Sequence, residues 1–196
     1  MALFKNKYRI ESTRLPSWDY AREGMYFVTI CTKGRECYFG DIDGGEMRLS
    51  AIGEVAEKEW YRTPELRPDM NLELGAFVVM PNHVHGIIMI GENPYNRDYE
   101  IVGDCRGAMH RASTINIHTI NNDHKNQFGP QRKNLASILR GYKSAVTVRA
   151  RKNNLAFCWQ ERFHDHIIRS MDDFHRISIY IKNNPGNWER DRFFGR

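Results

Sequence analysis

The sequence predicts an α+β fold: a ferredoxin-like antiparallel sheet with helices mainly on one face. Segments rich in β-branched and aromatic residues alternate with segments whose apolar residues repeat at the helical period. The resulting order is strand, helix, two strands, helix, strand, helix, which suits helices packed on an antiparallel sheet. At 196 residues and 41% hydrophobic content the chain can bury one substantial core, so we expect a single domain over residues 1–196.

The first expected elements lie before Pro64. Residues 25–32 (MYFVTICT) have the composition of a buried strand, and residues 46–50 that of a short edge strand. Ser50 is then placed as the N-cap of a helix whose apolar positions follow the 3.6-residue period. This helix is expected to end before Pro64.

Two further strands are expected over residues 71–80 and 83–90. Pro81-Asn82 separates them, and this pair favours a turn, so the two strands are predicted to form a hairpin. Residues 91–133 are rich in glycine, asparagine, aspartate and histidine and lack a sustained apolar period. We interpret them as a long loop or lid inserted in the domain.

The last third of the chain predicts a helix, a strand and a helix. The first helix starts at about Leu135 and has its apolar residues along one stripe, with basic residues on its other faces. A strand is expected over His164–Ser170. The final helix runs from Asp172 to Asn184 and is stopped by Pro185.

The charge of the chain favours a polyanionic partner, although the overall excess is small: a net charge of +5 and a pI near 9.1. Residues 131–170 contain nine basic and two acidic side chains. Such a segment is either a nucleic-acid-binding surface or a solvated helix face, and composition leaves both open. The candidate DNA-binding residues are Arg132, Lys133, Arg140, Lys143, Arg149, Arg151, Lys152, Arg162 and Arg169.

The four cysteines suggest neither a zinc site nor a disulfide framework, because they are scattered and form no CxxC pair. The N-terminal residues lack the apolar stretch of a signal peptide, and nothing in the chain has the length of a membrane span. We therefore expect a cytoplasmic protein.

Two histidines form the first candidate site. His83 and His85 are two positions apart on a predicted strand, so both imidazoles face the same side of the sheet. Imidazole commonly binds divalent metals, and two on one strand leave coordination positions open for a substrate oxygen. The alternative is a hydrogen-bonded, partly buried pair. Since His164-Asp165-His166 has the same spacing, spacing alone does not choose between the two pairs.

Two tyrosines are candidates for a second chemical role. Tyr142 falls on the apolar stripe of its helix and is expected in the core. Tyr180 lies on the flank of the last helix, and Asn184 lies one turn further along the same flank, so both could face one site. A flanking aromatic residue is also common at the rim of a helix, and helix geometry leaves that alternative open.

Three phrases in this order resemble the REP-associated tyrosine transposases, relatives of the small single-tyrosine transposases of the HUH endonuclease superfamily. They are MPNHVHGII (80–88), WQERFHDHIIR (159–169) and YIKNNPGNW (180–188). The resemblance also includes WDY…GMYFVTICT near the N-terminus and the G-x-hydrophobic-A…W segment from Gly53 to Trp60. It covers most of the chain outside 91–133 and implies the HUH endonuclease fold, with the nucleophilic tyrosine on the C-terminal helix.

The resemblance also implies a role for each candidate residue. His83 and His85 match the metal-binding pair and Tyr180 the nucleophile, and Asn184 matches an amide that serves as third metal ligand. An asparagine oxygen suits Mg²⁺ or Mn²⁺. By the same comparison, the histidines of His164-Asp165-His166 are structural or contact DNA.

The activity that the resemblance implies is metal-dependent, transposase-like cutting and joining of single-stranded DNA. Cutting would occur at or near REP-type hairpins of bacterial genomes, through a 5′-phosphotyrosine intermediate. The basic residues of 131–170, with Phe157, Trp159 and Phe163 as possible stacking surfaces, would hold the strand. We expect a monomer, with a homodimer as the alternative.

Two other functions fit the same residues. One is a protein that binds DNA hairpins without cutting them. The other is a metal hydrolase that uses the histidine pair to activate water, with Tyr180 as a rim residue. Only the transposase-like reaction predicts a covalent protein–DNA adduct.

Overall fold

The structure, a computed structural model, describes residues 15, 18–96 and 132–194. Most of the segment expected to be a lid, 91–133, lies outside these residues. The regular elements are β1 (Gly24–Cys31), β2 (Gly40–Asp43), β3 (Glu46–Leu49), α1 (Ala51–Tyr61), β4 (Leu72–Met80), β5 (His83–Ile90), α2 (Leu135–Lys152), β6 (His164–Ile168) and α3 (Met171–Asn183), with 3₁₀ helices η1 (Lys33–Arg35), η2 (Pro68–Met70) and η3 (Pro185–Arg190).

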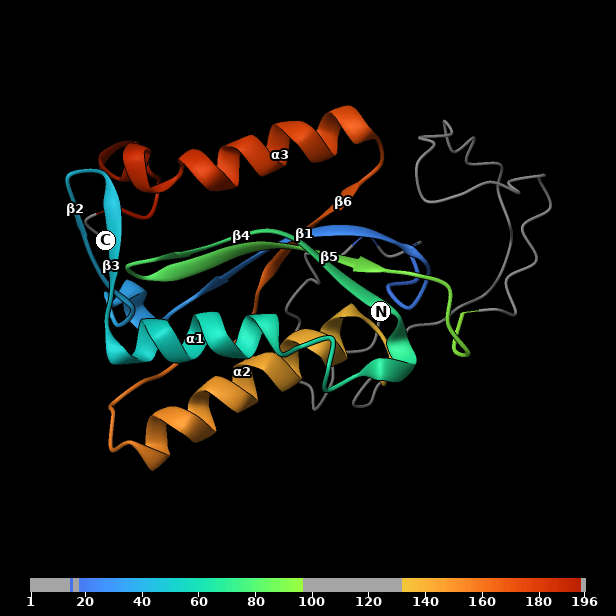
Figure 1. The fold of residues 1–196 in the computed structure, drawn as a ribbon, viewed down its shortest axis with the longest axis horizontal. Helices are drawn as coiled ribbons and strands as arrows, with labels where there is room; N and C mark the ends of the chain where they lie inside the picture. The colour runs from blue at the N-terminus through green and yellow to red at the C-terminus, as the bar shows by residue number, and fades with distance from the viewer. Residues whose placement is uncertain (1–14, 16–17, 97–131, 195–196) are drawn as a thin grey trace, which may run out of the picture.

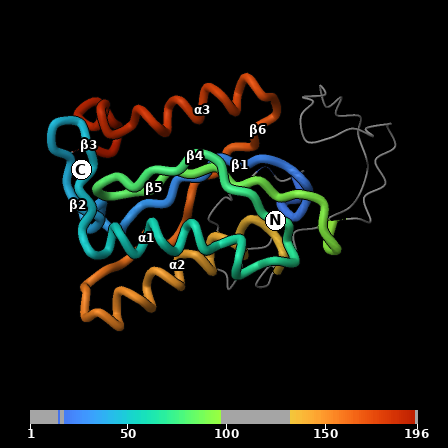
Figure 2. The backbone as a smooth tube through the Cα atoms, viewed as in Figure 1, coloured from blue at the N-terminus to red at the C-terminus, as the bar shows by residue number. Residues whose placement is uncertain are grey.

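Four strands form an antiparallel sheet in the order β4-β5-β1-β6. The α+β class expected from the sequence is therefore confirmed, including the hairpin of β4 and β5. Residues 46–50, expected as an edge strand, instead pair with β2 in a separate two-stranded hairpin. Figure 2 shows this hairpin at the same end of the sheet as the C-terminal end of α3, and β3 contacts η3 there.

Helices cover both faces of the sheet (Figure 1). Helices α1 and α2 pack on one face over the alternate residues Tyr26, Val28 and Ile30 of β1. Helix α3 covers the other face, where Ile177 and Ile181 pack on Ile87 of β5 and Ile168 of β6. Two of the three α-helices thus share a face, as expected, and the third lies on the face to which His83 and His85 point. None of the helices in the described part of the chain is long and apolar enough to cross a membrane.

Local sequence signals account for the helix ends that flank the candidate site. The Ser50 side chain accepts a hydrogen bond from the Gly53 amide at the start of α1, as expected, and Ser170 caps α3 in the same way. Pro185 has no amide hydrogen to donate, so α3 ends and the chain continues in η3. This change of course brings the C-terminal residues back toward β5.

The glycine after the second histidine leaves room for a core ring on the opposite face of β5. A Cβ atom at Gly86 would lie 2.3 Å from a ring carbon of Trp60, which is fully buried and stacked on Phe77. Gly86→Ala should therefore lower the free energy of unfolding by about 1–3 kcal/mol, the usual cost of overpacking a core. Urea denaturation would measure the change.

Gly186→Ala is the matched control, because a Cβ atom there meets nothing within 4 Å and should change stability little. Equal stability of the two variants would show that the contact between Trp60 and β5 relaxes easily.

Candidate active site

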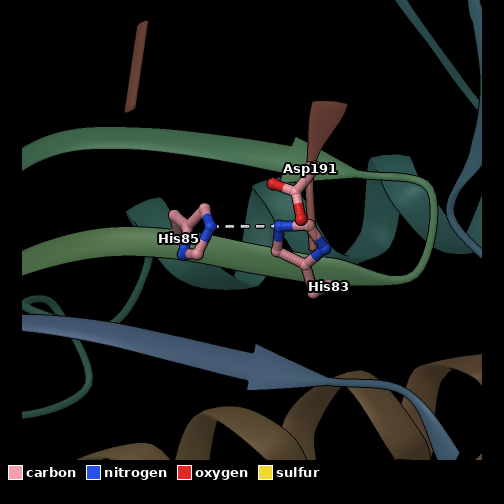
Figure 3. A group of neighbouring side chains, drawn as sticks. All are labelled: His83, His85 and Asp191. Atoms are coloured by element: carbon pink, nitrogen blue, oxygen red, sulfur yellow. Dashed lines mark hydrogen bonds between the residues drawn. The ribbon is translucent and has the colours of Figure 1, made fainter. Parts of the chain in front are cut away.

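The two histidines of β5 converge on one point. His83 and His85 are 0% and 1% exposed, and their Nε2 atoms lie 3.1 Å apart, on the face that α3 covers (Figure 3). Antiparallel pairing places His85 opposite Thr29 and His83 opposite Cys31 on β1. The prediction that both imidazoles share one sheet face is confirmed.

The separation of the two nitrogens fits a shared metal ion. Two ligands at about 2.1 Å from a six-coordinate ion, at a right angle, would be about 3.0 Å apart. The Nε2 atoms are 3.1 Å apart, and a carboxylate oxygen of Asp191 lies within 4.8 Å of a ring nitrogen of each histidine. In Figure 3 the Asp191 side chain extends toward the two rings from the C-terminal segment.

Hydrogen bonds fix the orientation of His83. The Asn82 amide nitrogen donates to the Phe193 carbonyl at 2.9 Å, so its oxygen is the atom facing His83 Nδ1, also at 2.9 Å. His83 Nδ1 must therefore carry the proton and donate to Asn82, which leaves the lone pair on Nε2. His85 Nδ1 lies 2.8 Å from the Thr29 hydroxyl, which can either donate or accept. Both rings are held as metal ligands usually are, by a partner on the nitrogen that faces away.

Burial keeps both histidines neutral. Removal from water lowers the pKa of His83 to about 2, with smaller contributions from His85 and the nearby Arg35 and Arg192 guanidinium groups. Burial likewise lowers the pKa of His85 to about 3, again with a contribution from Arg192. At neutral pH no proton has to leave either ring to expose two nitrogen donors.

Tyr180 meets this pair from α3. Its hydroxyl lies 3.3 Å from His85 Nε2, and its ring packs edge-on against Phe27. Tyr180 is 47% exposed, whereas the two histidines beneath it are buried. Partial burial raises the pKa of Tyr180, and a hydrogen bond with the Asn184 side chain lowers it in part, so the phenol is protonated at neutral pH.

Asn184 follows α3 and is buried beside Tyr180. Its Oδ1 atom is buried and has no hydrogen-bond partner among the described residues. An unpartnered buried acceptor is costly in a protein and calls for a partner such as a cation. Two neutral imidazoles and the Asp191 carboxylate form a group that fits a divalent metal ion, and Asn184 lies beside Tyr180 next to this group.

Asp191 is a member of this group that no sequence pattern predicts. The residue lies in a mixed-charge stretch, ERDRFF, and only the turn made by η3 after Pro185 brings it to the histidines. Its carboxylate also accepts a 2.7 Å hydrogen bond from the Phe193 amide, which fixes the local turn. No spacing rule connects Asp191 to His83, because their contact depends on the tertiary fold and not on local periodicity.

The other tyrosine and the other histidine pair that the sequence offered as candidates lie outside this site. Tyr142 is buried, as expected, and donates a 3.0 Å hydrogen bond to the Ala56 carbonyl, and burial raises its pKa well above the usual value. His164 and His166 share the sheet face of His85 but are exposed on β6, where His166 pairs with Asp173. Neither histidine of β6 belongs to the convergent group.

The basic residues expected to bind DNA lie mostly on the other side of the sheet. Helix α2 carries five of them, and it packs on the face opposite α3 (Figure 1). Several have partners within the protein: Arg149 pairs with the buried Glu59 of α1, Lys133 pairs with Asp69, and Lys143 donates to the Gln160 carbonyl. A role in DNA binding for the set stays a prediction.

The aromatic rings expected as stacking surfaces belong instead to the core. Trp159 is buried, and Phe157 and Phe163 are partly buried against the cluster under α2. Phe157 and Trp159 pack edge to face at 4.9 Å. These three rings therefore pack the segment before β6 onto the core.

The overall fold is that of the REP-associated tyrosine transposases. A structure of such a transposase bound to a REP hairpin superimposes with a TM-score of 0.52 at 20% sequence identity, covering 90% of this chain and 73% of that one. The fold implied by the three sequence phrases is thus confirmed.

At the level of sequence, the chain belongs to the same family as an uncharacterized protein of Haemophilus influenzae. The two are 36% identical over 188 residues, which are 93% of this chain and 92% of the relative. No protein-family model matches the chain.

Proposed function

We propose that this protein is a metal-dependent endonuclease and strand transferase for single-stranded DNA, with Tyr180 as its nucleophile. One observation carries the proposal: the Tyr180 hydroxyl lies 3.3 Å from His85 Nε2, at the point where the two histidines converge. A tyrosine that only covers the rim of its helix would not need its hydroxyl beside a buried pair of imidazoles. The shared fold with a transposase bound to a REP hairpin supports hairpins of this type as the substrate.

The metal would be Mg²⁺ or Mn²⁺, held by His83 and His85 with oxygen donors from Asn184 and Asp191. The unpartnered Asn184 oxygen and the proximity of Asp191 support these two as the remaining ligands. When bound, such an ion supplies positive charge that stabilises the oxyanion of a phosphate under attack.

The proposed reaction forms and breaks bonds as follows. Tyr180 Oη attacks phosphorus, a new bond to the phenol oxygen forms, and the bond from phosphorus to the 3′ oxygen breaks. The phenol proton passes to the solvent at the exposed side of the ring, and the leaving 3′ oxygen takes up a proton. Attack by a 3′-hydroxyl on the 5′-phosphotyrosine link reverses these steps and rejoins DNA.

All the proposed residues come from one chain. Tyr180 lies beside His85 of the same molecule, and Asn184 lies beside Tyr180, so no second subunit is needed to bring this tyrosine to the histidines. This supports a monomer that uses its own tyrosine.

The test is a search for a covalent adduct. The protein, incubated with a single-stranded REP-type hairpin oligonucleotide labelled at its 3′ end and with Mn²⁺ or Mg²⁺, should form a denaturation-resistant protein–DNA species that is absent in EDTA. The 3′ label distinguishes the 5′-phosphotyrosine from the opposite linkage. Metal-dependent cutting without any adduct would support the hydrolase instead, and binding without cutting would support a DNA-binding protein.

A further inference from the structure

Two arginines gather on one aromatic ring beside the histidine pair. The guanidinium carbon of Arg35 lies 3.9 Å from the ring centroid of Phe193, and that of Arg192 lies 4.5 Å from it. The same ring contacts His83, with centroids 4.7 Å apart. Two positive charges therefore lie against the same ring that contacts His83 of the proposed metal site.

Neither guanidinium group forms an ion pair with a carboxylate of the described residues. Arg35 donates a hydrogen bond to the Cys31 sulfur at 3.1 Å, and Arg192 is exposed. Four other arginines of the described residues differ in this respect, because each pairs with a carboxylate: Arg48, Arg62, Arg149 and Arg176. Because both groups contact the same ring, their like charges repel each other, and a bound anion would offset that repulsion.

The backbone at Arg35 is itself unusual. Its φ is +62°, in the left-handed region that disfavours residues with a Cβ, and it follows Gly34 at +64°. Its ring contact with Phe193 and its hydrogen bond with Cys31 hold the side chain over the C-terminal segment. Strained backbone of this kind often accompanies a side chain with a positioning role.

We infer that Arg35 and Arg192 form a phosphate subsite for the nucleotide next to the scissile phosphate, an inference that rests on the proposed function. A guanidinium stacked on a ring still directs its edge N–H groups outward; Arg35 donates one of them to Cys31, and the remaining N–H groups of the two arginines can bind phosphate oxygens. Phe193 separates the arginines from the histidines, so they hold a neighbouring phosphate and fix the register of the strand. Both are positioning residues, because the reacting atoms lie at Tyr180.

Binding of single-stranded DNA without metal tests this subsite. Every protein carries Tyr180→Phe and is assayed in EDTA, so that neither cutting nor metal affinity enters the measurement. Fluorescence anisotropy with a labelled hairpin oligonucleotide that bears a single-stranded 5′ extension gives the affinity at several salt concentrations. Arg192→Ala and Arg35→Asn, the latter chosen because asparagine tolerates a left-handed backbone, should each weaken binding about tenfold.

The salt dependence separates a phosphate contact from a loss of folding. The double variant should lower the slope of log affinity against log salt by about 0.7, the value for one phosphate contact on a single strand. Circular dichroism confirms that the fold is kept. Lys58→Ala removes an exposed positive charge from α1, on the other face, and should leave the affinity and the slope unchanged.

The outcomes distinguish the inference from the proposed function. If the parent protein binds DNA and the double variant keeps both its affinity and its salt slope, the subsite is overturned while the endonuclease proposal stands. If Lys58→Ala weakens binding as much as the arginine variants do, the effect is one of net charge and the subsite is likewise overturned. If the parent protein binds no single-stranded DNA, both proposals fail.

Discussion

Tyr180→Phe should eliminate the covalent protein–DNA species and lower the rate of strand cutting by at least about a thousand-fold. The substitution removes the attacking oxygen and nothing else, and loss of a covalent nucleophile in other enzymes costs this much or more. The ring contacts with Phe27 and His85 remain, so folding and metal binding should be preserved. The measurement is adduct formation by denaturing gel, with the rate of cutting from a time course.

Tyr142→Phe is the matched control, since it deletes the same atom from the other face of the sheet. It removes the buried hydrogen bond to the Ala56 carbonyl and should cost about 1 kcal/mol of stability, with adduct formation unchanged. Cutting that persists in Tyr180→Phe would mean that water is the nucleophile. Loss of the adduct in Tyr142→Phe alone would mean that the nucleophile lies on α2.

Local periodicity accounts for the parts of the site that the sequence could predict. The two-residue period of a strand places His83 and His85 on one face, and the helical period places Tyr180 and Asn184 together on a flank of α3. The buried stripe of Phe174, Ile177 and Ile181 then sets how α3 lies on the sheet. These relations need no knowledge of which elements become neighbours.

The remaining parts depend on contacts that periodicity does not encode. Amphipathic spacing says that the basic side of α2 faces away from the core, but not that α2 lies on the sheet face opposite Tyr180. Asp191 and Arg192 reach His83 only because the chain turns back after Pro185, and Arg35 approaches from the loop after β1. Strand β2 has the sequence GDID, and glycine and aspartate are depleted in strands, so its composition does not predict one.

Loss of a histidine ligand should abolish metal binding and, with it, the metal-dependent reaction. His83→Ala removes one of two neutral nitrogen donors and should weaken Mn²⁺ binding at least about a hundredfold, with loss of the adduct at millimolar metal. The readout is the rise in melting temperature on adding Mn²⁺, because a ligand of the folded state stabilises it in proportion to the logarithm of its concentration over Kd. In His83→Ala that rise should vanish.

Single substitutions of Asn184 and Asp191 show which of these two residues supplies an oxygen ligand to the metal. Asn184→Ala deletes a buried acceptor that has no partner, so the metal-free protein should lose little stability, whereas its Mn²⁺-dependent rise in melting temperature should shrink. A purely structural amide predicts the reverse pattern, a less stable protein with normal metal binding. Asn183→Ala, at the exposed neighbouring position, controls for changes at the end of α3.

Asp191→Ala completes the comparison. Its carboxylate brings a full negative charge to the ion, so its removal should weaken Mn²⁺ binding at least as much as removal of the neutral amide oxygen does. If Asp191→Ala abolishes binding while Asn184→Ala leaves it intact, the third ligand is the carboxylate. The Asn184 amide would then serve only to hold the Tyr180 hydroxyl, and Asn184→Ala should slow adduct formation at saturating metal.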